Sequence, residues 1–411
     1  MSVAHRLIRA VFGIELRGGM GENPAMIHLD ANASTPLRAE VLEAMLPWLR
    51  DGYANPSGTH RAAKQARQAI EQARGQVAEW LGAQPAEIVF TGGGTESVNT
   101  ALRSLDHNAG KGHAVVSAIE HSAVLRCAEA LSREVLRVPV NAGGRLDLDR
   151  LVAGLPGAAM VSVMAANNET GVIQPIRDVC ALAHGQGVVV HSDAVQAAGK
   201  IAVDVRDWGV DMLSISAHKF HGPKGVGALF VRCGLAFTPW LLGGGQEGGR
   251  RSGTENTAGI VGMGAAAVLM RRQLEADGQA GLAHLRDAFE AKLLAELPGV
   301  TVNGDVRHRL PNTSHLSFDG CEAAGLLILL DEAGIACSAG SACMSGTQRP
   351  SHVQLAMGID EIRARSSLRF SFSTLNTMGE AFAAAVMVKR AVERLRQVQG
   401  SGVGPVQVYC A

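Results

Sequence analysis

The stretch GVVVHSDAVQ, residues 187–196, joins three consecutive valines to a polar group that includes Asp193 and Gln196. A short apolar run of this kind is typical of a buried strand. Similar runs recur between residues 87 and 232, separated by helical stretches or loops: EIVF, HAVVSAIEH, AAMVSVMAA, MLSISAHK and VGALFVR. This alternation predicts an α/β fold with a mostly parallel sheet covered by helices on both faces.

Polar side chains at the ends of these runs are the first candidates for function. In open α/β sheets, ligands bind beyond the carboxyl ends of the strands. The polar residues found there are Thr91, His121, Asn168, Asp193, His218 and Lys219.

Length and composition exclude several classes of protein. The chain has 411 residues, so we expect about two domains. A hydrophobic fraction of 47% excludes a disordered chain, and a formal net charge of zero gives no electrostatic reason to expect nucleic acid or an anionic membrane as partner. Aromatic residues, at 4%, are too scarce for base-stacking platforms, and no apolar run approaches the roughly 20 residues needed to cross a bilayer.

The cysteines favour free thiols. There are seven, and they are scattered along the chain: Cys127, Cys180, Cys233, Cys321, Cys337, Cys343 and Cys410. This pattern argues against a disulfide framework and for a reducing cytoplasm. No Cys/His cluster supplies four ligands, so no metal site is expected. Cys343 stands in SAGSACMSG, residues 338–346, among small or flexible neighbours.

Four segments are expected along the chain. Residues 1–25 carry three arginines and suit an amphipathic helix or a transit peptide, but we favour an upstream start or a loose extension. Residues 26–270 are predicted to form a large domain whose first residues pack with the small one. Residues 271–399 are predicted to form the small domain with the Cys343 loop. Residues 400–411 form a Gly-rich tail.

The domain boundary falls within a predicted helix. The pattern of residues 265–297 predicts this helix, with Gly278 as a weak point and Pro298 as a stop.

A glycine-rich turn follows the first of the apolar runs. In TGGGTESV, residues 91–98, Thr95 is a plausible N-cap for the helix that follows. Free amides at a helix N-terminus can bind a phosphate, although many such turns are purely structural.

Asp193 and Lys219 each have an ordinary and a functional interpretation. A carboxylate at a strand end can cap a helix, or it can hold a ring nitrogen protonated, as pyridoxal chemistry requires. A lysine there can form a surface ion pair, or a Schiff base if its amine is desolvated. Ser216 and His218 flank Lys219 and can donate to a phosphate. Together with the glycine turn, these residues form the set that pyridoxal 5′-phosphate needs.

With these motifs in place, the sequence resembles the cysteine desulfurases of the class V aminotransferase family, particularly the branch that supplies sulfur for nitrogenase and for general iron–sulfur assembly. The matching motifs cover roughly residues 27–395: HLDANAST, NPSGTH, IVFTGGGTES, EHSAVL, NNETGVIQPI, HSDAVQAAGK, SAHKFHGPKGVG, GGGQEGGRRSGTEN, PNTSHLSF, GSACMSG, PSHV and SSLRFSFS. The resemblance implies the type I fold of pyridoxal-dependent transferases, with a seven-stranded, mostly parallel sheet in the large domain and a smaller α/β C-terminal domain.

The resemblance also implies how the cofactor would be held. Lys219 would carry pyridoxal 5′-phosphate as a Schiff base, Asp193 would pair with the ring nitrogen and Gln196 with the ring hydroxyl. His121 would stack on the ring and shuttle protons. The phosphate would be held by a set of five residues: Gly94 through its backbone, Thr95, Ser216, His218 and, across a homodimer, Thr254 of the partner subunit.

For the substrate, L-cysteine, Asn168 and Arg369 would fix the carboxylate. Cys343 would be the nucleophile that takes the sulfur as a persulfide, releasing L-alanine, and its loop would swing to pass the sulfur to an iron–sulfur scaffold protein. Cys337 is near enough in the sequence to act as a sulfur relay.

The chain departs from the family's motifs at two positions, and three alternative functions compete with the cysteine desulfurase interpretation. Ala31 stands where the family has asparagine, and Gly248 where a basic residue is usual. The rivals are a selenocysteine lyase or the other desulfurase branch, another class V aminotransferase, and a pyridoxal-fold protein retained only as a binding or scaffold partner. Gly340-Ser341-Ala342-Cys343 differs from the Arg-x-Gly-His-His-Cys of the lyases, an aminotransferase would not need Cys343, and a scaffold would have no use for Lys219.

Overall fold

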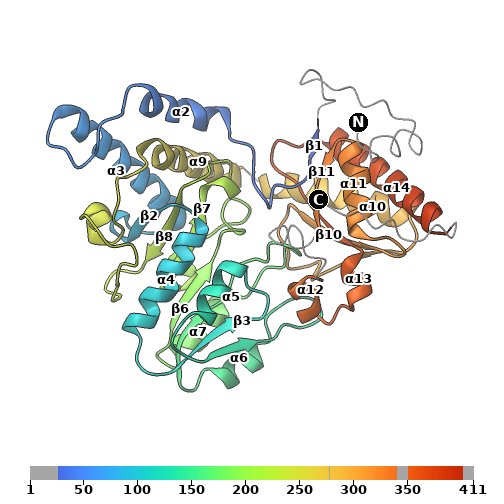
Figure 1. Cartoon of the computed structure of the whole chain (residues 1–411), viewed down its shortest axis with the longest axis horizontal. Helices are drawn as coiled ribbons and strands as arrows, with labels where there is room; N and C mark the ends of the chain where they lie inside the picture. The colour runs from blue at the N-terminus through green and yellow to red at the C-terminus, as the bar shows by residue number, and fades with distance from the viewer. Residues whose placement is uncertain (1–25, 277, 340–349, 401–411) are drawn as a thin grey trace, which may run out of the picture.

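A seven-stranded sheet forms the centre of the larger part of the molecule (Figure 1). The computed structural model describes residues 26–276, 278–339 and 350–400. The strands lie in the order β2 (Ile88–Thr91), β8 (Gly227–Val231), β7 (Met212–Ser216), β6 (Val189–Asp193), β5 (Ala158–Ser162), β3 (His113–Ser117) and β4 (Val135–Val138). Only β8 runs antiparallel to its neighbours. The predicted mostly parallel sheet of seven strands is confirmed.

Strand β4 was not predicted from the sequence. It lies at the sheet edge and pairs only with β3. Leu136 and Arg137, in its middle, are both exposed, so the strand lacks the apolar run that identified the others.

Helices cover both faces of this sheet, as predicted. Val89 packs with one apolar cluster, and its neighbours Ile88 and Phe90 pack with the other, on the opposite face. The helices of the large part are α2 (Ala39–Arg50), α3 (Arg61–Leu81), α4 (Gly94–Asn108), α5 (Ser122–Glu129), α6 (Leu148–Gly154), α7 (Ile176–His184), α8 (Val205–Trp208) and α9 (Thr257–Glu275). Helices α4 and α5 pack on one face, and α3, α6, α7 and α9 on the other.

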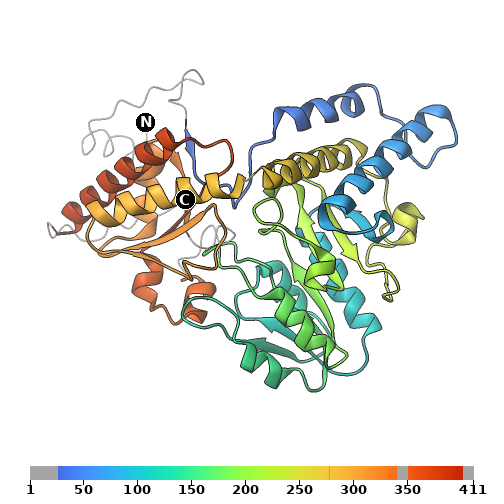
Figure 2. The ribbon, with the colours of Figure 1, turned by 180° about the vertical axis from the view of Figure 1, so that it is seen from behind.

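A second apolar core belongs to the C-terminal part of the chain. Its antiparallel sheet has the order β12 (Ser338–Ala339), β13 (Ser367–Ser371), β10 (Thr313–Phe318) and β9 (Val300–Val302). The helices here are α10 (Gly278–Glu296), α11 (Ala323–Glu332), α12 (His352–Ala356), α13 (Glu361–Arg365) and α14 (Met378–Gly400). Figure 2 shows α10 and α14 side by side against this sheet.

The helix predicted over residues 265–297 is two helices, α9 and α10, with the break just before Gly278. Met270 of α9 belongs to the core of the large sheet, whereas Leu282 and Phe289 of α10 belong to the second core. The break lets the chain pass from one core to the other.

The N-terminal segment crosses between the two cores. Strand β1 (Ile27–His28) pairs in parallel with β11 (Ile335–Ala336), and Ile27 and Leu29 are part of the second core. Ten residues later, α2 packs on α9 of the large part. Residues 30–35 therefore lie where the two parts meet.

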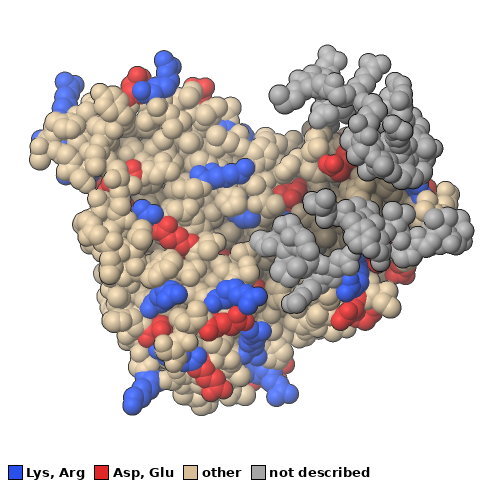
Figure 3. Space-filling model, in the orientation of Figure 1, with Lys and Arg blue, Asp and Glu red and all other residues tan. Residues whose placement is uncertain are grey.

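Within the described residues, no helix combines the length and the apolarity that a membrane crossing requires. On the face seen in Figure 3, basic and acidic side chains are interspersed, which agrees with the zero net charge.

Candidate active site

The glycine turn, the end of β6 and the end of β7 converge. Asp193 and Ser216 are the last residues of the paired strands β6 and β7. A Cβ placed on Gly94 would lie 2.7 Å from Val195 Cγ2 and 3.4 Å from Ser216 Cβ, and a Cβ on Gly227 would lie 2.7 Å from the carbonyl carbon of Gly93. Only glycines allow backbone segments to approach so closely. The N-terminus of α4 therefore packs closely against the residues that follow β6 and end β7.

The N-cap of α4 is Gly93, so the prediction that Thr95 caps the helix was wrong. Gly93 has a φ of 148°, which a side chain would disfavour, and this lets the helix begin at Gly94. Thr95 lies in the first turn with its side chain exposed.

Asp193 is buried, and its Oδ1 accepts a hydrogen bond from the Val195 amide at 3.0 Å. Burial raises the pKa of this carboxyl, while the nearby His121 and Lys219 lower it. A buried acid with a raised pKa gains most from a cationic partner.

His121 follows β3 and caps α5. Its Nδ1 accepts a hydrogen bond from the Ala123 amide at 3.1 Å, which leaves the ring proton on Nε2. Burial lowers the pKa of His121, and Lys219 lowers it further, against the opposing effect of Asp193. The ring is therefore neutral at pH 7.

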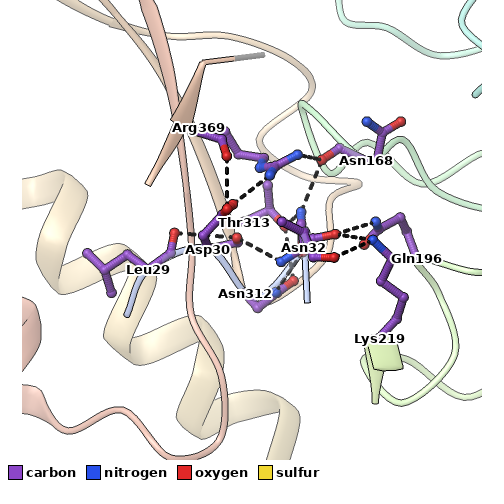
Figure 4. Close-up of polar contacts among 12 residues, drawn as sticks. Leu29, Asp30, Asn32, Asn168, Gln196, Lys219, Asn312, Thr313 and Arg369 are labelled. Atoms are coloured by element: carbon purple, nitrogen blue, oxygen red, sulfur yellow. Dashed lines mark hydrogen bonds and ion pairs between the residues drawn. The ribbon is translucent and has the colours of Figure 1, made fainter. Parts of the chain in front are cut away.

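Lys219 does not end its strand, as was predicted, but lies in the 3₁₀ turn Ala217–Lys219 that follows β7. Its Nζ donates to the carbonyl oxygens of Asn32 at 2.7 Å and Ala33 at 2.8 Å (Figure 4). The neighbouring His218 lies 3.3 Å from Ser34 Oγ through Nδ1, and burial together with Lys219 lowers its pKa to about 4. His218 is thus a neutral donor or acceptor.

Arg369 reaches the same place from β13 of the second core. It is 1% exposed; its Nη2 pairs with Asp30 Oδ1 at 2.6 Å and its Nη1 donates to the Asn168 carbonyl at 2.9 Å. The remaining guanidinium nitrogen, Nε, has no hydrogen-bond partner among the described residues. Figure 4 shows the Asn168 side chain directed away from Arg369, so only its backbone contacts the guanidinium.

Asn32 joins these groups, although no role was predicted for it. Its carbonyl also accepts from Gln196 Nε2 at 2.9 Å, and its Nδ2 donates to Thr313 Oγ1 and to the Asn168 carbonyl. Asp30 was missed as well. The polar stretch that follows directly after β1 was the available signal, since it matched the family motif HLDANAST.

Two predicted residues lie apart from this cluster or outside the structure. Thr254 is exposed and lines a cleft of ≈ 130 Å³ with Thr91 and Gly92. Cys343, with the loop predicted to carry it, lies outside the described residues.

The flanks of residues 340–349 are nevertheless placed. On one side, Ser338 pairs with Arg369 in the sheet, and its hydroxyl donates to Asp30 Oδ2 at 2.9 Å. On the other side, the Ser351 hydroxyl donates to Glu169 Oε2 at 2.5 Å, next to Asn168. Both flanks therefore lie beside the groups that contact Arg369.

Cys337 is poorly suited to the relay role considered for it. Burial, with Asp30 contributing, raises the pKa of its thiol to about 12. The thiol is therefore protonated at pH 7, and a protonated thiol is a weak nucleophile.

The sheet topology, with an acid at one strand end and a half-buried lysine after the next strand, defines the type I fold of pyridoxal-dependent transferases. A family model for "Aminotransferase class-V" matches residues 27–381. A cysteine desulfurase of Trichormus azollae is 45% identical over 377 residues, which cover 90% of this chain and 94% of the relative. The cysteine desulfurase NifS of Azotobacter vinelandii is 43% identical over 391 residues, covering 93% and 97%. A solved structure of a NifS-like protein has a TM-score of 0.84 at 35% identity and covers 90% of this chain and 100% of its own. The chain belongs to the class V aminotransferase family.

Proposed function

We propose that the protein is a pyridoxal 5′-phosphate-dependent cysteine desulfurase, which converts L-cysteine to L-alanine and keeps the sulfur as a persulfide on Cys343. The observation that carries this proposal is the meeting of the half-buried Lys219 amine, the buried acid Asp193 and the buried guanidinium of Arg369 at the junction of the two cores. The relatives named cysteine desulfurase support it.

The residues present fit the cofactor. The N-terminus of α4, where Gly94 packs closely against Val195 and Ser216, suits a phosphate. Asp193 provides the acid whose pKa is raised by burial and which a protonated ring nitrogen would satisfy. When bound, pyridoxal 5′-phosphate supplies an electron sink that labilises bonds at the substrate's α- and β-carbons.

Each of the predicted site residues would have a part in holding the cofactor. Lys219 would attach it, Asp193 would pair with the ring nitrogen, Gln196 with the ring hydroxyl, and His121 would stack on the ring. The phosphate set is Gly94, Thr95, Ser216, His218 and the exposed Thr254, which would act on the cofactor of a partner subunit in a homodimer. The neutral state of His121 leaves it able to accept a proton at pH 7.

Arg369 is the proposed site for the carboxylate of L-cysteine. A guanidinium can bind a carboxylate through two parallel hydrogen bonds, and Asp30 with the Asn168 carbonyl fixes its plane. Asn168 contributes its side chain only if that chain turns from the direction seen in Figure 4.

The position of Ser338 and Ala339 beside the Arg369 contacts supports the proposed role of Cys343. Ala339 pairs with Leu368, one residue before Arg369, and Cys343 follows four residues later. Four extended residues span at most about 14 Å. The Cys343 thiolate attacks the sulfur of L-cysteine: a sulfur–sulfur bond forms and the carbon–sulfur bond breaks. The electron pair stays with carbon, which takes a proton and becomes the methyl group of L-alanine.

The persulfide sulfur would pass to an iron–sulfur scaffold protein. Within the described residues the cysteines carry no disulfide, in keeping with a cytoplasmic enzyme.

Single-turnover formation of alanine and persulfide tests the proposal. The parent protein should give both products from L-cysteine. Cys343→Ser should still perturb the visible spectrum of the bound cofactor on adding L-cysteine, but form no persulfide. Cys337→Ser, six residues away, serves as the matched control and should behave as the parent. If Cys343→Ser releases alanine as fast as the parent, Cys343 is not the nucleophile, and an aminotransferase becomes the better account.

A further inference from the structure

A second lysine, Lys200, is buried beside Lys219 and has no part in the function proposed above. It is 5% exposed. Its Nζ donates to Gln196 Oε1 at 2.5 Å and to Asn32 Oδ1 at 3.0 Å. No carboxylate of the described residues forms an ion pair with it. A lysine is seldom buried with only neutral partners, since burial disfavours its charge.

The turn that carries Lys200 is fixed against the turn that carries Lys219. Gly199 has a φ of 80°, and a Cβ on it would lie 2.5 Å from the Cβ of Phe220. Phe220, directly after Lys219, is itself 1% exposed. Only glycine allows this contact. Packing of the two turns therefore fixes the position of Lys200 relative to Lys219.

Lys200 and Asn32 together fix which way the Gln196 amide faces. The Asn32 carbonyl can only accept, so the Gln196 nitrogen must face it, at 2.9 Å. Lys200 then donates to the Gln196 oxygen on the other side. One of the two N–H groups on Gln196 Nε2 is thereby used, and the second is left as a donor.

Lys200 also acts on the side chain of Asn32. Asn32 Oδ1 accepts from both Lys200 and Asn312, while Nδ2 donates to Thr313. The backbone carbonyl of this same residue receives Lys219 Nζ. Lys200 therefore contacts Asn32, one of the two residues whose carbonyls receive Lys219.

We propose that Lys200 is a positioning residue, which orients the Gln196 amide as a donor toward the cofactor's ring hydroxyl and fixes the Asn32 carbonyl that receives Lys219. This inference rests on the proposed function, since it assumes the cofactor at Lys219. Charged groups facing Lys200 come from two other elements: Lys219 after β7 and Arg369 of β13. Burial and these two cations lower the pKa of Lys200 well below its ordinary value.

The test compares the parent with Lys200→Met, which keeps the length and apolar stem but removes the donor. The cofactor-loaded proteins are titrated by visible absorbance against pH. A hydrogen bond donated by Gln196 to the ring oxygen favours the ionised form of that oxygen. Losing this donor should therefore raise the midpoint of the absorbance titration by about one pH unit. Alanine formation should fall about 10-fold in kcat, with KM for L-cysteine within about threefold, because Arg369 is unchanged. Lys111→Met, on an exposed loop, is the control and should match the parent.

An unchanged titration midpoint in a folded Lys200→Met protein overturns the inference and leaves Lys200 with a packing role only. Should Lys200→Met fail to fold, Lys200→Gln, which keeps one donor, is measured instead; it should shift the midpoint by less, and no shift at all again overturns the inference. If the parent itself attaches no cofactor at Lys219, or forms no alanine, the proposed function fails first, and that result is read before any variant.

Discussion

Two regions build the site in different ways: the strand ends of the large sheet, and the crossing segment of residues 27–33. The first places Asp193 and Ser216 by the pairing of β6 with β7. The second contains only a two-residue strand, and it is placed by contacts with distant residues, among them Ser371 and Arg369. The crossing segment nevertheless supplies both the carbonyls that hold Lys219 and the acid that holds Arg369.

The difference shows that Asp193 and Ser216, on the proposed cofactor side, are placed by one core, whereas the contacts of Arg369 and Lys219 depend on the docking of two. Movement between the cores would alter the Arg369 contacts first, since Asp30 and Asn168 meet the guanidinium from different parts of the chain. The following predictions test this division.

The largest effect is expected at the Asp30–Arg369 pair in the crossing segment. Asp30→Ala leaves a nearly buried guanidinium without its acid, so the free energy of unfolding should fall by about 3 kcal/mol. KM for L-cysteine should also rise, because the guanidinium loses its orientation. Urea unfolding and steady-state kinetics measure both. Glu361→Ala breaks an exposed pair with Arg365 and should cost less than about 1 kcal/mol. Equal losses in the two variants contradict the account.

Within the large sheet, His191 should make the fold sensitive to acid. Its two ring nitrogens each lie 2.9 Å from a hydroxyl, of Ser162 and Ser214, and burial lowers its pKa to about 3. Below pH 6.5 His191 becomes protonated in the unfolded chain but stays neutral in the folded protein. Its contribution to the free energy of unfolding is therefore fully present above pH 6.5 and is lost as the pH falls toward 3. At pH 5 this residue alone should remove about 2 kcal/mol.

Urea unfolding at pH 5 and pH 7 measures this loss. His191→Gln should reduce the difference between the two pH values by about the same amount. A difference as large as that of the parent would show that His191 is not the source.

A smaller effect is expected at the glycine turn before α4, and it should concern cofactor affinity rather than stability. Gly94→Ala places a methyl 2.7 Å from Val195 Cγ2, so cofactor affinity should fall about 10-fold, measured by equilibrium titration of the apoprotein. Gly75→Ala is the matched control, because a Cβ there meets nothing within 4 Å. It lies inside α3 and should raise stability by about 0.5–1 kcal/mol without changing affinity. Similar affinities for both variants would mean that the turn does not hold the phosphate.

The smallest effect is expected at Cys337. Because its thiol is protonated at pH 7, Cys337→Ser should change the rate of persulfide transfer by less than about twofold. A loss comparable with that of Cys343→Ser would restore the relay interpretation.

The same contrast explains what the sequence predicted. Asp193, Ser216 and the glycine turn lie at strand ends, where the apolar runs mark their position directly. Asp30, Asn32 and Lys200 act through partners far away in the chain, which periodicity does not reveal. The cap of α4 was misassigned because the N-cap is a glycine with a φ of 148°, and no side chain caps this helix. Edge strand β4 was missed because its exposed residues break the apolar pattern.

The central claim is that Lys219, and not its buried neighbour Lys200, carries the cofactor. Borohydride reduction of the loaded protein, followed by proteolysis and peptide mass spectrometry, measures this directly. The account predicts the pyridoxyl mass on the peptide of Lys219 alone. The same mass on the peptide of Lys200, or on neither lysine, would contradict it.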